Sequence, residues 1–93
     1  MFFMDGKNTL KNLCKDLNYD SEILAHSLKV YDSALIKGMD KKYKYMALAA
    51  GSLYFYCKST GKPIILRNIL DALPVDSEEV ISFYNEMKRY TLR

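Results

Sequence analysis

An apolar run from Tyr45 to Cys57 constrains the fold of this chain more than any other feature. Only Gly51 and Ser52 within the run lie outside the apolar set. A helix that is hydrophobic on all sides is buried on most of them. The run therefore predicts a central helix that other helices surround, and its small residues predict a close approach of those neighbours.

The borders of this helix follow from the residues beside the run. Asp40 is expected to cap its start and Gly61 to end it, which places the helix at about 41–60. A strand over 52–57 that turns into residues 64–66 is an alternative, because aromatic residues are frequent there. The helix is favoured, since no turn signal separates the alanine-rich part of the run from the aromatic part.

Two helices are expected before the central one and two after it, so the fold class is an all-α five-helix domain with a central buried third helix. The outer helices are expected at about 8–17, 21–37, 63–73 and 77–92. In each of them, apolar residues recur at the spacing of one helix face. The residues expected to face the core are Leu10, Leu13, Cys14 and Leu17 in the first helix; Leu24, Leu28, Tyr31 and Leu35 in the second; Leu66, Ile69, Leu70 and Leu73 in the fourth; and Val80, Phe83, Tyr84, Met87 and Tyr90 in the fifth.

Capping residues predict where the outer helices begin and end. Asn18 is expected to stop the first helix. Asp20 is expected to cap the second, with Gly38 in a left-handed conformation just beyond its end. Asp76 and Glu79 have the spacing of a capping box at the start of the fifth helix.

The fourth and fifth helices are joined by only a few residues around Pro74. A short amphipathic helix, a tight turn and a longer capped helix predict a helix-turn-helix-like pair at about 64–73 and 77–92. A chain of 93 residues fits one domain, so residues 1–93 are expected to form a single unit.

The sequence contains no catalytic, metal-binding or cofactor-binding constellation. His26 is the only histidine, and Cys14 and Cys57 have no partners at the spacing of a zinc site. The acidic residues include no pair placed for general acid–base chemistry. We therefore expect a binding protein rather than an enzyme, with two buried, reduced thiols.

The ends of the chain and its hydropathy indicate an intracellular protein. Met1-Phe2-Phe3-Met4 is followed at once by Asp5, so it is too short for a secretory leader. No stretch approaches the roughly 20 apolar residues of a membrane span. The expected location is the cytoplasm, the nucleus or a virus-infected cell, without membrane association.

The basic residues form two groups, one at each end of the expected third helix. The net charge is +3, and each group could neutralise a few phosphates with a salt-dependent affinity. A solvated rim around a buried helix is the alternative explanation. The eight tyrosines are interpreted as packing residues rather than as stacking platforms for single-stranded bases. The candidate residues for binding nucleic acid or an acidic partner are Lys37, Lys41, Lys42, Lys44, Lys58, Lys62 and Arg67.

A series of short motifs runs through the expected third, fourth and fifth helices. Its members are Ala49-Ala50, Leu53-Tyr54, Cys57-Lys58, Gly61-Lys62-Pro63, Leu66, Ile69, Ala72, Val75, Glu79 and Val80. Over about 46–90 this series resembles a repeat of transcription factor IIB. That family typically shows an alanine-rich helix, Leu-Tyr, a Cys followed by a base, and Gly-x-Pro.

The resemblance implies a cyclin-like five-helix fold and a non-catalytic module related to transcription initiation or its regulation. General factors of the family carry a zinc ribbon and two repeats, whereas this chain has one repeat and no ribbon. The implied partners are a transcription-complex protein, either a promoter-binding factor or RNA polymerase, and/or duplex DNA.

The start of the fifth helix departs from the family pattern. Family repeats contact DNA near this point and often have two lysines after the cap, where this chain has Ser77 and Glu78. Carboxylates at the expected start of a recognition helix repel phosphates, so this helix is less expected to bind DNA. The alternative function is a cyclin-like protein–protein interaction or homo-oligomerisation module without a nucleic-acid role.

Overall fold

The computed structural model describes residues 6–91. This part of the chain contains five α-helices and one 3-10 turn and no strand, so the helical interpretation of residues 52–57 is confirmed and the strand alternative is wrong. Residues 1–4, considered as a leader, and the predicted helix end at Leu92 lie outside the described residues. The elements are α1 (Gly6–Asp16), α2 (Ser21–Ile36), η1 (Met39–Lys41), α3 (Tyr45–Thr60), α4 (Leu66–Ala72) and α5 (Ser77–Thr91).

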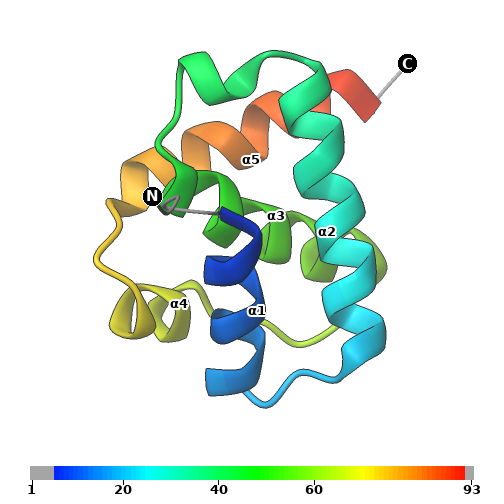
Figure 1. The fold of residues 1–93 in the computed structure, drawn as a ribbon, viewed down its shortest axis with the longest axis vertical. Helices are drawn as coiled ribbons and strands as arrows, with labels where there is room; N and C mark the ends of the chain where they lie inside the picture. The colour runs from blue at the N-terminus through cyan, green and yellow to red at the C-terminus, as the bar shows by residue number, and fades with distance from the viewer. Residues whose placement is uncertain (1–5, 92–93) are drawn as a thin grey trace, which may run out of the picture.

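The centre of the fold is α3, as the apolar run predicted. Residues 47–53 are all buried, and α1, α2 and α5 each make their most extensive helix contacts with α3. Figure 1 shows α1 and α2 side by side and α5 running diagonally toward the C-terminus. None of the described helices is both long and apolar enough to cross a membrane.

The close packing of α3 against α5 depends on Gly51. A Cβ atom built on Gly51 would lie 2.8 Å from Cε2 of Phe83 and closer still to Cδ2. The Phe83 ring is itself fully buried and has no open space to enter. A side chain at position 51 would therefore force the two helices apart, which explains a glycine inside a long helix.

The end of α1 and the start of α2 follow the predicted signals. Asn18 adopts a left-handed conformation with φ 62°, and the Tyr19 amide donates a hydrogen bond back to the Cys14 carbonyl at 2.8 Å. This arrangement is a helix-ending Schellman motif. Asp20 then caps α2, because its Oδ1 accepts a hydrogen bond from the Ile23 amide at 2.9 Å.

The buried face of α2 agrees with the predicted one except at Leu35. Ser27, Tyr31 and Ala34 are buried, whereas Leu35 is 37 % exposed and Ile36 85 % exposed. The prediction that Leu35 faces the core is therefore wrong. Tyr31 is buried as predicted, and Leu24 and Leu28 are partly buried against the core.

The predicted start of α3 is also wrong. Gly38 has the expected left-handed φ of 76°, but residues 39–41 then form η1, and α3 begins only at Tyr45. Met39 is buried beneath this turn, and the Tyr43 side chain reaches α5. Asp40 lies inside η1, and Lys44 occupies the N-cap position of α3. Asp40 is therefore not an N-cap.

Two boundaries in the second half differ from the predictions. Residues 63–65 are not helical, and α4 begins at Leu66, because the Pro63 carbonyl accepts a 2.7 Å hydrogen bond from the Tyr19 hydroxyl while Ile65 is extended. On α4 only Ile69 is fully buried. The predicted helix-turn-helix-like pair is present as α4 and α5, although α4 packs mainly against α1. On α5, Tyr90 is 44 % exposed, so its predicted inward position is wrong.

We expect the substitution Ser27→Ala to stabilise the fold by about 1 kcal/mol. Ser27 Oγ is fully buried and has no hydrogen-bond partner among residues 6–91, and an unsatisfied buried hydroxyl is destabilising. The matched control is Ser52→Ala, because Ser52 is equally buried but its hydroxyl donates a 2.6 Å bond to the Leu48 carbonyl. Urea denaturation should show a gain for Ser27→Ala and none for Ser52→Ala. An equal loss in both variants would contradict the prediction.

Candidate functional site

The seven predicted cations lie at the two ends of α3, in two separate groups. The first basic group consists of Lys37, Lys41, Lys42 and Lys44, on the connection from α2 through η1 to α3. The second basic group consists of Lys58, Lys62 and Arg67, from the last turn of α3 to the first turn of α4. A 16-residue α3 separates them, which corresponds to about 24 Å of helix.

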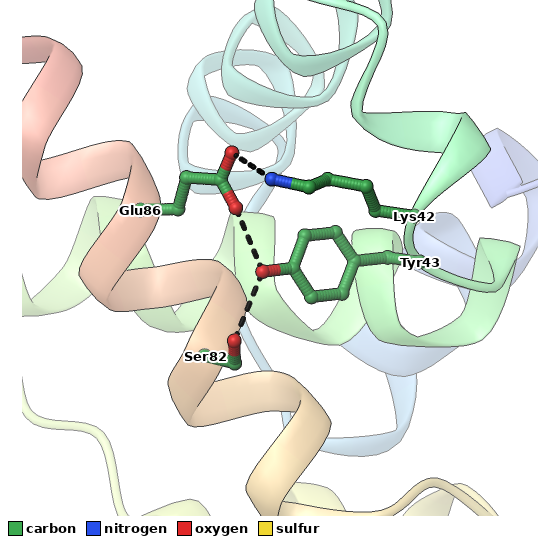
Figure 2. Close-up of polar contacts among 4 residues, drawn as sticks. All are labelled: Lys42, Tyr43, Ser82 and Glu86. Atoms are coloured by element: carbon green, nitrogen blue, oxygen red, sulfur yellow. Dashed lines mark hydrogen bonds and ion pairs between the residues drawn. The ribbon is translucent and has the colours of Figure 1, made fainter.

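The first basic group is anchored to α5 by Lys42. Its ammonium lies 2.9 Å from Oε2 of Glu86, and Oε1 of the same carboxylate accepts a 2.8 Å hydrogen bond from the Tyr43 hydroxyl. Since the Tyr43 proton is used in that bond, the Ser82 hydroxyl at 3.0 Å is the donor to the Tyr43 oxygen. Figure 2 shows this network of four residues bridging the connection and α5.

The network determines the protonation states of Glu86, Lys42 and Tyr43. The hydrogen bond from Lys42, followed by that from Tyr43, holds the pKa of Glu86 below its ordinary value. The same contact with Glu86 raises the pKa of Lys42, and burial raises the pKa of Tyr43. At neutral pH, Lys42 and Glu86 therefore form a charged pair beside an un-ionised tyrosine.

The other side chains of the first basic group remain at the surface. The Lys37 ammonium donates to the Ser33 hydroxyl at 3.0 Å and lies 5.2 Å from the centroid of the Tyr90 ring. Lys41 and Lys44 are exposed. The second basic group is less organised: Lys58 lies 5.8 Å from the Tyr54 ring centroid, and Arg67 pairs with Asp71 at 3.6 Å along the same helix.

The acidic start of α5 has a structural role that the sequence did not reveal. Asp76 Oδ1 accepts a hydrogen bond from the Glu78 amide at 3.2 Å, as expected of a cap. The Glu79 carboxylate does not complete the predicted capping box; instead its Oε2 accepts a 3.0 Å bond from the Lys44 amide. Glu79 thus caps α3, whose own N-cap residue offers no side-chain bond.

The predicted start of a recognition helix, Ser77 and Glu78, lies in the first turn of α5. Ser77 is half-buried, and Glu78 is exposed beside Asp76. Neither residue is brought near either basic group by a hydrogen bond or ion pair within residues 6–91. This end of α5 is therefore acidic, while its other end carries Lys88 and Arg89.

The two cysteines are buried, and the histidine packs against a tyrosine ring. Burial, with a smaller contribution from the nearby Cys57, raises the pKa of Cys14 to about 11, and burial likewise raises the pKa of Cys57. Both thiols are thus protonated and poorly nucleophilic. The His26 ring stacks on Tyr56 with centroids 5.1 Å apart. No cluster of potential metal ligands occurs among the described side chains.

The fold has five α-helices with α3 buried at its centre, and the motif series continues into α5. Both features agree with a comparison against protein families. The family model described as the transcription factor TFIIB repeat matches residues 1–90. The chain belongs to the TFIIB repeat family. A TFIIB repeat is a cyclin-like all-α fold, so the expected fold class is confirmed. Searches of curated proteins and of solved structures gave no significant match.

Membership of the TFIIB repeat family places the chain among transcription-related cyclin-like modules. In this TFIIB repeat, the sequence patterns placed the seven basic residues at the two ends of the central helix. They did not predict the hydrogen-bond network of Lys42 and Glu86, and they did not predict that Glu79 caps α3. No local signal could have revealed either one. Lys42 and Glu86 are 44 positions apart, and Lys44 and Glu79 are 35 apart.

Proposed function

We propose that residues 1–93 form a single-repeat, non-catalytic module that acts in transcription initiation or its regulation by docking to a protein of the transcription complex. The partner would be a promoter-binding factor or RNA polymerase. The observation that carries this proposal is the separation of the basic residues into two groups at opposite ends of α3, with an acidic start of α5.

A continuous basic surface is the electrostatic footprint of a duplex-binding domain. Here the cations at the two ends of α3 are about 24 Å apart along the helix. The carboxylates of Asp76, Glu78 and Glu79 lie at the start of α5, where the resemblance to transcription factor IIB implies a contact with DNA. Contacts with a protein need no such continuous surface, because a small number of residues dominate the affinity of most interfaces.

The test measures binding of the purified chain to three immobilised probes by interferometry. The probes are a promoter-binding factor, RNA polymerase and a promoter duplex, each at about 50 and about 200 mM salt. Saturable binding to one of the proteins at the higher salt concentration is the expected result. Binding to neither protein would refute the proposal, and sedimentation of the free chain would then show whether it binds a second copy of itself.

Binding to duplex DNA through all seven cations is the second candidate, and the exposed lysines of the first basic group favour it. The triple variant Lys37→Ala, Lys41→Ala, Lys44→Ala spares Lys42, which pairs with Glu86. If DNA is the partner, the slope of log affinity against log salt concentration should be shallower for this variant, by an amount that corresponds to about three phosphate contacts. The control variant replaces Lys11, Lys15 and Lys29, which are exposed on α1 and α2. The same slope in both variants would exclude the first basic group as the DNA contact.

A further inference from the structure

A hollow lies beside the last turns of α5, next to the network of Figure 2. It is lined by Lys42, Glu86, Arg89 and Tyr90 and has a volume of ≈ 300 Å³. That volume is at the lower end of the range for ligand pockets, which start at about 300 Å³. The hollow is therefore large enough for one or two side chains of a partner, and we call it the Tyr90 hollow.

The charge available in the Tyr90 hollow is positive. Among residues 6–91, Glu86 is the only acidic residue that lines it, and both of its carboxylate oxygens are already bonded, one to Lys42 and one to Tyr43. Its side chain is only 13 % exposed, whereas that of Lys42 is 61 % exposed. Arg89 is also exposed. A carboxylate that enters the hollow would meet Arg89 and the exposed side of Lys42, which already pairs with Glu86, and an arginine can bind it through two hydrogen bonds.

The hollow also offers an apolar contact. Tyr90 is 44 % exposed, and the Lys37 ammonium lies 5.2 Å from the centroid of its ring, which adds a third cation near the hollow. Tyrosine and arginine are enriched among the residues that dominate protein interfaces, because they combine apolar area with polar atoms. An exposed ring among cations fits a ligand that is both acidic and hydrophobic.

We propose that the Tyr90 hollow binds a short acidic peptide segment of a protein partner, with a carboxylate on Arg89 and Lys42 and an aromatic or aliphatic side chain on Tyr90. This inference rests on the proposed protein-docking function and deepens it. The acidic segment is complementary in charge to the first basic group. It needs no contact with the second basic group at the other end of α3.

A short acidic segment fits this surface better than a nucleic-acid duplex does. A duplex presents phosphates along a stiff rod, so it extends well beyond a hollow of this size. If it ran along α5, it would meet Asp76, Glu78 and Glu79, because a helix of 15 residues spans only about 22 Å. A flexible peptide can place one carboxylate in the hollow and avoid the acidic end.

The proposal is tested with synthetic peptides and the full chain labelled with ¹⁵N. The first probe alternates Glu and Asp around one central Phe; a second replaces the acids by Gln and Asn, and a third replaces Phe by Ala. The first peptide should shift the amide signals of residues 41–43 and 86–90. The second should cause no shift there, and the third should bind about tenfold more weakly. Equal shifts with the neutral peptide, or shifts at both ends of α3, would overturn the proposal.

Two substitutions and a matched control separate this site from a general charge effect. Arg89→Gln and Arg89→Glu should each weaken binding of the first peptide, the second by about tenfold or more. The control is Lys58→Glu, which makes the same charge change beside another tyrosine ring, in the last turn of α3. Circular dichroism verifies that all variants are folded. An equal loss for Arg89→Glu and Lys58→Glu would refute a specific site.

The outcomes also distinguish this inference from the proposed function. If Arg89→Glu still binds the promoter-binding factor or RNA polymerase as the natural chain does, the hollow is not the docking site, although the docking function stands. If the peptide binds at the hollow but neither protein binds the chain, the proposed function fails while the acidic-peptide site remains. A promoter duplex that displaces the peptide would favour nucleic acid and overturn the proposal.

Discussion

Replacing Gly51 with alanine should destabilise the protein by about 1–3 kcal/mol, which is the usual cost of overpacking a core. Alanine is the better helix former by about 1 kcal/mol, so a neutral position would gain stability from this change. At position 51 the added Cβ would approach the Phe83 ring much more closely than van der Waals contact allows, and Phe83 is fully buried. The steric effect therefore outweighs the gain in helix propensity.

Urea denaturation of Gly51→Ala, monitored by circular dichroism, measures this loss. The control is Ser59→Ala, an exposed position in the last turns of the same helix, where a change within about 0.5 kcal/mol is expected. Combining Gly51→Ala with Phe83→Leu should cost less than the sum of the two single changes, because the smaller side chain relieves the overlap. A stabilised Gly51→Ala variant would show that α3 and α5 are not in close contact.

The substitution Glu86→Ala should cost about 1–3 kcal/mol at neutral pH, the range for a hydrogen-bonded charged group. Glu86 receives hydrogen bonds from both Lys42 and Tyr43, and it joins α5 to the connection that leads into α3. The change leaves Tyr43 with Ser82 alone. Chemical denaturation at pH 7 measures the loss, and Asp40→Asn, which removes an exposed carboxylate from η1, is the control.

The contribution of Glu86 to the stability of the fold should decrease as the pH is lowered. Hydrogen bonding holds its pKa below 4.5, so the folded state favours the ionised form. This contribution to stability is present above pH 4.5 and is lost as the pH falls through the lowered pKa of the folded state. The difference in stability between the natural chain and Glu86→Gln should therefore shrink on acidification. A difference that stays constant from neutral pH to below the folded pKa would contradict the charged network.

The parts of the fold that the sequence predicts are those with local causes. The run from Tyr45 to Cys57 placed α3 at the centre, because its composition leaves no polar face for solvent. Asp20 and Gly61 marked helix ends through bonds and backbone angles within a few residues of themselves. Such signals are complete within a short window of sequence, so they need no knowledge of the tertiary structure.

The predictions that were wrong concern features that depend on residues far away in the sequence. The start of α3 is set by Tyr43, whose hydroxyl bonds to residues on α5 about 40 positions away. The start of α4 is set by the bond from Tyr19 to the Pro63 carbonyl. In the candidate site, Glu79 had the right spacing for its own helix but caps α3 instead. Sequence spacing identified residues able to make these bonds, but it could not identify their partners.

The position of α3 limits how the molecule can come apart. Because α1, α2 and α5 each have their largest contacts with α3, none of them keeps its main packing surface once α3 leaves. Nor can α3 persist alone, since nine of its 16 residues are buried and would all be exposed to water. Partial opening therefore gains little conformational entropy for a large loss of apolar contact. The domain should unfold as one cooperative unit, and a partner that holds the end of α5 would stabilise every helix at once.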